Sequence, residues 1–224
     1  MSMVERETGW RIFENVFAAR ECDDLLAALA TVPQGRAGAR HLIRRAEIAA
    51  LANDERLLSL ARQGLNTKDA VPYRATLFAK TGRANWLVVW HQDTALPLVE
   101  RFDAEGWGPW SVKEGIHYAH APTWALQRIV ALRIHLDAST AANGPLRVIP
   151  NSHSQGVLSD NDVAQYVSAH SAVECLVERG GVLAMSPLLI HASSKAQNDA
   201  PRRVLHIEYA DALELASGIC LAKA

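Results

Sequence analysis

Short apolar runs separated by turn-forming residues fill the chain from Val71 onward, and they constrain its fold more than any other feature. The runs are rich in β-branched residues, and Gly, Asn and Pro stand between them, as in Asn143-Gly144-Pro145. This spacing predicts antiparallel strands. We expect them at Arg74–Lys80, Trp86–Gln92, Ile129–Leu136, Leu146–Ile149, Ala172–Leu176, Gly181–Met185 and Arg203–Tyr209.

The first part of the chain has a helical pattern instead. After a first strand at Trp10–Phe17, apolar residues recur at helical spacing, and Asn53 or Asp54 is placed to cap the last helix. Helices followed by many strands predict an α+β, mainly β fold with a barrel or a double-sheet jelly roll. We expect one domain over residues 1–224, in which residues 1–70 form a mainly helical flank and residues 71–224 the core. The predicted helices are Ala19–Val32, Arg45–Ala52 and Asp54–Leu65.

Residues 102–124 are rich in Gly, Trp, Pro and His and show no clear period. A long ordered loop in a compact domain is usually functional, so we expect a lid over a binding site. The alternative is that its tryptophans only anchor the loop by packing and that its histidines are structural. Aromatic and polar candidates in this loop are Trp107, Trp110, His117, Tyr118, His120 and Trp124, and the predicted substrate contacts are Trp107, Trp110 and His117.

A candidate metal site is formed by His91 and Asp93, two residues apart in a predicted strand, and by the distant His191. Residues two apart in a strand project from the same face. Two imidazoles and one carboxylate make the facial triad of non-haem Fe(II) enzymes, which leaves coordination positions open. Arg202 suits a carboxylate of a co-substrate because its guanidinium binds carboxylates bidentately. The alternative is that Arg202 and Arg203 are solvated surface charges.

A second His-x-Asp sequence, His135-Leu136-Asp137, lies in another predicted strand, and spacing alone does not choose between the two. The same ligand set also suits catalytic zinc, although the sequence shows no general base for a zinc hydrolase. A metal-binding jelly-roll module without turnover is a further alternative. Lys80 lies close enough to His91 in sequence to reach the site from a neighbouring strand, but we expect it to be solvated.

Composition excludes several classes of partner. The chain of 224 residues has a net charge of −1 and no long Lys/Arg run, which argues against a nucleic-acid or membrane-surface binder. Its cysteines, Cys22, Cys175 and Cys220, are far apart and lack metal-site spacing, which is typical of a protein from a reducing compartment. No apolar signal core opens the chain. We therefore expect a cytoplasmic protein that acts on a small-molecule substrate.

Several separated elements, in order, resemble the phytanoyl-CoA dioxygenase family of Fe(II)/2-oxoglutarate oxygenases. They are Asn85-Trp86, Trp90-His91-Gln92-Asp93, Arg133-Ile134-His135-Leu136-Asp137, Asn143-Gly144-Pro145-Leu146-Arg147-Val148-Ile149-Pro150-Asn151-Ser152-His153, His191-Ala192-Ser193 and Arg202. One departure is Asn151, where the family usually has Gly. Asn tolerates a left-handed backbone well, so this departure changes little.

The resemblance implies a double-stranded β-helix, a cupin-like jelly roll, with helices outside one sheet. It places His91, Asp93 and His191 on Fe(II), Arg202 and Ser193 on the distal carboxylate of 2-oxoglutarate, and Gln92 near this co-substrate, and it leaves His135 and Asp137 structural. The implied activity is O₂-dependent hydroxylation of a small molecule with release of succinate and CO₂. The carboxylate of Asp93 favours hydroxylation or another oxidative outcome, such as desaturation, over halogenation. The substrate itself is not specified.

Overall fold

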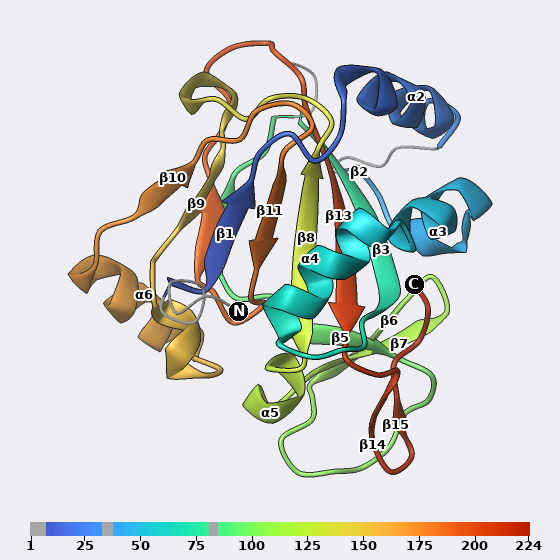
Figure 1. Cartoon of the computed structure of the whole chain (residues 1–224). Coiled ribbons are helices and arrows are strands. Elements are labelled where there is room, and N and C mark those ends of the chain that lie inside the picture. Colours follow the sequence, from blue (N-terminus) through green and yellow to red (C-terminus); the bar gives the residue numbers. More distant parts are fainter. Residues whose placement is uncertain (1–7, 33–37, 81–84) are drawn as a thin grey trace.

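Antiparallel sheets make up most of the molecule (Figure 1). The computed structural model describes residues 8–32, 38–80 and 85–224. The larger sheet contains, in spatial order, β1 (Trp10–Phe13), β11 (Val182–Met185), β8 (Ile129–His135), β13 (Arg202–Ala210), β3 (Val71–Lys80) and β2 (Gly38–Ala39). The smaller sheet contains β10 (Val173–Cys175), β9 (Leu146–Val148), β12 (His191–Ser193) and β4 (Val88–His91). The predicted mainly β, antiparallel architecture is therefore confirmed.

Two further sheets close one end of the molecule, at the bottom of Figure 1. One has the order β5 (Ala95–Leu98), β7 (Ile116–His120) and β6 (Trp110–Lys113), and the other pairs β14 (Glu214–Ala216) with β15 (Ile219–Cys220). Residues 102–124, predicted as one long loop, thus contain the β6–β7 hairpin and the first residues of α5 (Thr123–Leu126). The alternation in the hairpin is short, which is why no strand period was visible in the sequence.

Helices cover the outer face of the larger sheet, and α4 crosses in front of β8 and β13 (Figure 1). The three predicted helices are present as α2 (Ala19–Leu29), α3 (Ala46–Ala52) and α4 (Glu55–Leu65). Asp54 caps α4, because its side chain accepts a hydrogen bond from the amide of Arg56. A further helix, α6 (Asp160–Ala169), is not among the predicted ones, although Ser159 caps it in the same way. Short 3₁₀ turns occupy Leu42–Arg44, Ala141–Asn143 and Ser152–Gln155.

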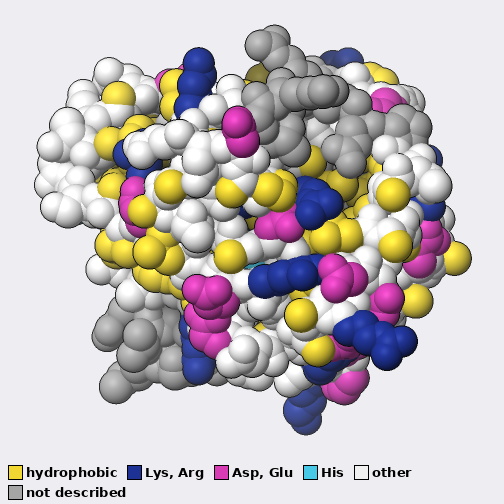
Figure 2. Space-filling model, turned by 90° about the horizontal axis from the view of Figure 1, so that it is seen from above, with side chains coloured by type: hydrophobic (Ala, Val, Ile, Leu, Met, Phe, Trp, Pro, Cys, Tyr) yellow, Lys and Arg dark blue, Asp and Glu magenta, His cyan; other side chains and the backbone are white. Residues whose placement is uncertain are grey.

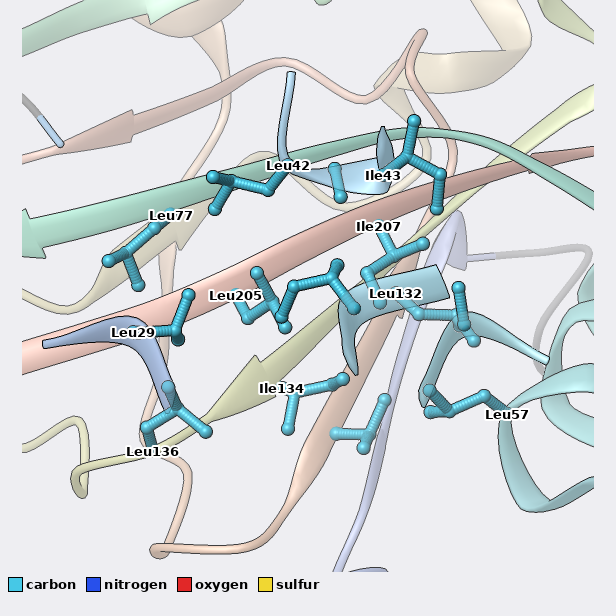
Figure 3. Packing of buried hydrophobic residues seen from close by; sticks show 14 of the residues in the cluster. Leu29, Leu42, Ile43, Leu57, Leu77, Leu132, Ile134, Leu136, Leu205 and Ile207 are labelled. Atoms are coloured by element: carbon cyan, nitrogen blue, oxygen red, sulfur yellow. The ribbon is translucent and has the colours of Figure 1, made fainter. Parts of the chain in front are cut away.

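The main hydrophobic core lies between these helices and the larger sheet (Figure 3). Alternate residues of the strands point into it, such as Leu132 and Ile134 from β8 and Leu205 and Ile207 from β13, and Leu57 of α4 packs against them. All of these side chains are fully buried. The period of two along each strand therefore fixes which residues face the opposite side of the sheet.

The opposite face of the larger sheet carries buried polar side chains in register. Lys80 of β3 pairs with Arg202 of β13, and Arg74 of β3 pairs with Glu208 of β13. Arg133 of β8 lies opposite His206 of β13. Buried charged residues are rare in protein cores unless they are paired or functional, so this face marks the interior in which a site can form. Members of this set that are almost fully buried are Lys80, Arg133, His135, Arg202, His206 and Glu208.

Basic and acidic side chains are intermingled on the face seen in Figure 2, so neither sign of charge dominates it. Within the described residues, no helix is both long and apolar enough to cross a membrane.

Candidate functional site

His91, Asp93 and His191 come together where the smaller sheet ends. β12 pairs with β4 so that His191 lies opposite His91, and their ring centroids are 4.3 Å apart. The Asp93 carboxylate lies 3.6 Å from His91 Nε2 and 3.5 Å from His191 Nε2. One ligand atom from each residue lies within 4.8 Å of the other two, which is close enough for one metal ion to contact all three.

Asp93 reaches this position differently from the sequence expectation. The strand ends at His91, so Asp93 follows it in a loop instead of continuing the pleat. Its backbone amide donates to Pro187 O at 2.9 Å, which holds the loop against the segment before His191. The segments that supply the three candidate ligands are thus tied together by a backbone hydrogen bond.

Both histidines are oriented by their own strands. His91 Nδ1 lies 2.9 Å from Val89 O, and His191 Nδ1 lies 2.8 Å from Leu189 O. A carbonyl can only accept, so Nδ1 carries the hydrogen in each ring and Nε2 keeps its lone pair. Metal-binding histidines in proteins commonly have this arrangement, with the second ring nitrogen donating to a backbone carbonyl.

Protonation states at the site also suit a metal ion. Burial lowers the pKa of His191 to about 4, so its ring is neutral at physiological pH. Burial by itself would raise the pKa of Asp93, but His191 and His91 beside the carboxyl hold it well below its usual value. Burial by itself would lower the pKa of His91, but the contact with Asp93 raises it. An anionic carboxylate and neutral imidazoles are the forms that bind metals, so metal binding would release any proton held between His91 and Asp93.

A cluster of buried cations surrounds Ser193, two residues after His191. Ser193 Oγ accepts from Lys80 Nζ at 2.8 Å and from Arg202 Nη2 at 3.2 Å, and donates to Gly144 O at 2.9 Å. Gly144 has a φ of +69°, and a Cβ there would lie 3.1 Å from Lys80 Nζ. The expectation that Lys80 is solvated was therefore wrong, because its side chain is 1% exposed.

No carboxylate of the described residues neutralises Arg202. Its Nε is buried without a hydrogen-bond partner, and burial together with the nearby Arg133 lowers its pKa to about 10. Burying a guanidinium unpaired is costly unless a ligand supplies the missing acceptor. The pair Arg202 and Ser193, expected at a co-substrate carboxylate, is thus brought together with Lys80 in a place that suits an anion.

Gln92 lies in this region but its amide is used elsewhere. Its Nε2 donates to Gly156 O at 2.8 Å and to Leu188 O at 2.7 Å, and its Oε1 accepts from the amide of Leu158 at 2.9 Å. Both amide hydrogens are therefore engaged by backbone carbonyls. These contacts tie two loops to the site, and Gln92 lines the cavity next to His91 and Asp93, so its position near the co-substrate stays a prediction.

A cavity of about 320 Å³ opens beside the triad. Tyr118 and His120 of the predicted lid line it, whereas Trp107, Trp110 and His117 do not. Trp107 and Trp110 pack with Phe102 against the hydrophobic cluster at the end of the molecule, so for them the alternative of packing anchors holds. His117 precedes Tyr118 in β7 and points to the other face. The structure thus places Trp107, Trp110 and His117 outside the lining of this cavity, and their contact with the substrate stays a prediction.

The second His-x-Asp sequence is separated from this cavity and has structural contacts. His135 Nδ1 is hydrogen bonded to Ser139 Oγ at 2.9 Å. Asp137 accepts from Arg203 Nε at 2.7 Å and from Arg203 Nη2 at 2.8 Å. Arg203 thus forms an ion pair, while Arg202 on the opposite face of β13 is buried.

Comparison with known proteins agrees with this geometry. The chain matches the family model described as phytanoyl-CoA dioxygenase (PhyH) over residues 6–204, and no curated protein sequence matches it. It is similar to the structure of AviO1 from Streptomyces viridochromogenes Tue57, with 22% identity, a TM-score of 0.65, and coverage of 93% of this chain and 92% of that chain.

Two other similar structures carry informative descriptions. EctD from S. alaskensis with 2-oxoglutarate and 5-hydroxyectoine has 21% identity and a TM-score of 0.69, and the match covers 92% of this chain and 73% of that chain. SnoK, a non-heme alpha ketoglutarate dependent carbocyclase from nogalamycin biosynthesis, has 16% identity and a TM-score of 0.70, with 93% and 82% covered. At these identities the likeness shows a shared fold. The family match, which spans most of the chain, goes further: the protein belongs to the phytanoyl-CoA dioxygenase family and is an Fe(II)- and 2-oxoglutarate-dependent oxygenase that uses O₂.

Proposed function

We propose that the protein hydroxylates a small molecule, with His91, Asp93 and His191 as the iron ligands. The observation that carries this proposal is the convergence of three ligand atoms within 4.8 Å, two of them on imidazoles whose Nδ1 atoms are tied to backbone carbonyls. These residues fit the metal in number, type and protonation state. When bound, Fe(II) and 2-oxoglutarate together activate O₂, and the co-substrate leaves as succinate and CO₂.

The far carboxylate of 2-oxoglutarate is proposed to bind Arg202, with Ser193 and Lys80 beside it. Support comes from the unpaired Nε of Arg202 and from the two cations that share Ser193 Oγ. An ionised carboxylate would supply the acceptors that this buried cluster lacks. Gln92 and the amide of Asp93 serve by holding the loops around the ligands in place.

The fold proposed for these parts is a double-stranded β-helix, with the larger and smaller sheets as its two walls and residues 1–224 as one domain. Its support is the strand order of the two antiparallel sheets and the presence of helices on the outer face of the larger one (Figure 1). Such a fold places the candidate ligands between the sheets, which shields the chemistry from bulk water.

The test is turnover. Purified protein would be incubated with 2-oxoglutarate and O₂, with Fe(II) or Zn(II), and succinate would be measured together with candidate substrates. We expect succinate only with Fe(II), and an oxygen atom added to the substrate. Desaturation or another oxidation would keep the iron site and change the reaction outcome. Turnover that Zn(II) supports without O₂ would favour a zinc hydrolase, and metal binding without any 2-oxoglutarate binding would favour a non-catalytic module.

A further inference from the structure

The walls of the cavity beside the triad are unevenly charged. Basic side chains lining it are Arg40, Arg74 and Lys113, and its acidic lining residue is Asp93, one of the candidate iron ligands. The whole chain has a net charge of −1, so this excess of positive charge is local. An excess of basic over acidic side chains in the lining attracts ligands of negative charge.

Arg74 is fixed at the inner wall of this cavity. Its Nη2 donates to Glu208 Oε1 at 2.7 Å, its Nε lies 2.6 Å from Glu208 Oε2, and its Nη1 donates to Ala95 O at 3.0 Å. A guanidinium has two hydrogens on each terminal nitrogen, so one on Nη1 and one on Nη2 have no acceptor among the described residues. Arg74 therefore keeps hydrogen-bond donors for a ligand while Glu208 holds it in place.

Glu208 is itself part of a buried row. Arg133 Nη1 lies 3.1 Å from His206 Nδ1, and His206 Nε2 lies 3.3 Å from Glu208 Oε1. Since Arg133 can only donate, Nδ1 accepts and Nε2 carries the hydrogen toward Glu208. This row fixes the Glu208 carboxylate, which in turn orients the Arg74 guanidinium.

At the mouth, Arg40 and Lys113 have no acidic partner among the described residues. The nearest acid in sequence, Glu114, is engaged instead by His41, with Oε2 3.1 Å from Nδ1. His41 Nε2 accepts from the Tyr118 hydroxyl at 3.1 Å, so Glu114 helps to hold the cavity wall. Partial desolvation, and after it the charges of Arg40 and Arg74, lower the pKa of Lys113.

We propose that the substrate is a small molecule with an oxyanionic group, a carboxylate or a phosphate, that Arg74, Arg40 and Lys113 bind. The proposal rests on the proposed function, since the same cavity contains His91 and Asp93. Its volume, about 320 Å³, is at the lower end of the range of roughly 300–1,000 Å³ for small-molecule sites, which favours a compact metabolite.

The test uses three probes that share a phenyl ring and differ in the attached group: the anions benzoate and phenyl phosphate, and the neutral benzamide. Each would be titrated by calorimetry into metal-free protein at saturating 2-oxoglutarate. Each would also be added anaerobically to protein loaded with Fe(II) and 2-oxoglutarate while the visible charge-transfer band of the iron-bound keto acid is followed. We expect at least one anion to bind roughly tenfold more tightly than the neutral amide, because hydrogen bonds to charged groups are the stronger ones. A tighter benzoate indicates a carboxylate substrate, and a tighter phenyl phosphate indicates a phosphate.

Variants test which basic residues cause the preference for anionic probes. Arg40→Gln/Lys113→Gln changes only exposed side chains and should reduce the anion preference by roughly two- to tenfold. Arg74→Gln should reduce it by about tenfold or more. Lys68→Gln, an exposed cation remote from the cavity, is the matched control and should change nothing. Three results would overturn the proposal. They are equal affinity for all three probes, no detectable binding of either anion, and an anion preference that both sets of variants retain.

The visible band reports on the iron site, and calorimetry reports on anion binding in the cavity. If the Fe(II)–2-oxoglutarate band forms but the anions show no preference, the iron site stands and the substrate class is wrong. If no band forms, calorimetry still reports whether the cavity selects anions.

Discussion

Replacing Gln92 with alanine removes three hydrogen bonds that tie the loops at Gly156, Leu158 and Leu188 to the candidate iron site. Gln92 is 9% exposed, so the backbone groups it leaves behind gain little contact with water. At about 1 kcal/mol for each bond, the loss is about 3 kcal/mol of folding free energy. For a chain of this size, this corresponds to a fall in Tm of roughly 6–12 °C.

The assay is thermal unfolding of metal-free protein followed by circular dichroism, with 2-oxoglutarate affinity measured in parallel at low temperature. Gln63→Ala is the matched control, because Gln63 is exposed and makes one long hydrogen bond of 3.4 Å to Ser59. Its Tm should stay within about 2 °C of wild type. A Gln92→Ala protein with unchanged Tm and weakened 2-oxoglutarate binding would refute the structural role and support the co-substrate role.

Three further perturbations test the electrostatic arrangement. Burial lowers the pKa of Lys80 from 10.5 to about 8. Between these two pH values the unfolded chain binds more protons than the folded one, so the free energy of unfolding should rise with pH. Urea titrations should show this rise in wild type and its loss in Lys80→Met. Asp137→Asn should leave 2-oxoglutarate binding intact and lower the free energy of unfolding by about 1–2 kcal/mol in the same urea assay. Loss of 2-oxoglutarate binding would instead support His135 and Asp137 as metal ligands. Glu208→Gln leaves Arg74 buried beside a neutral amide and should cost about 3–5 kcal/mol; a loss below about 1 kcal/mol would show that the pair is not fixed as described.

The sequence was sufficient for the strands with long, uniform apolar patterns. β8 and β13 were predicted within one or two residues, because each is buried on both faces and reads as a continuous run. β6 and β7 were missed, because each is short and their hairpin lies among Trp, Gly and Pro residues that obscure the alternation. The left-handed backbone expected for Asn151 is present, with a φ of +68°.

Site residues could be predicted where a motif fixes them and not where strand phase decides. The ligand pattern alone left two His-x-Asp sequences open, and the family resemblance selected His91, Asp93 and His191, which the structure brings together. In β7, by contrast, the substrate candidate His117 is one residue out of phase with Tyr118, which lines the cavity. Arg74 and Lys80 were not assigned to the site, because burial of a charge depends on which strand lies opposite. Their alternation with Leu77 and Ala79 in β3 was the available signal.

The most direct test of the iron site is anaerobic. Metal-free protein would receive Fe(II) and then 2-oxoglutarate, and the visible charge-transfer band of the chelated keto acid would be recorded for wild type, Asp93→Ala, His191→Ala and Arg202→Ala. We expect a band in wild type, its loss in Asp93→Ala and His191→Ala, and a much weaker affinity for 2-oxoglutarate in Arg202→Ala. Folded, iron-loaded wild type without a band, or a band unchanged in Asp93→Ala, would contradict this expectation.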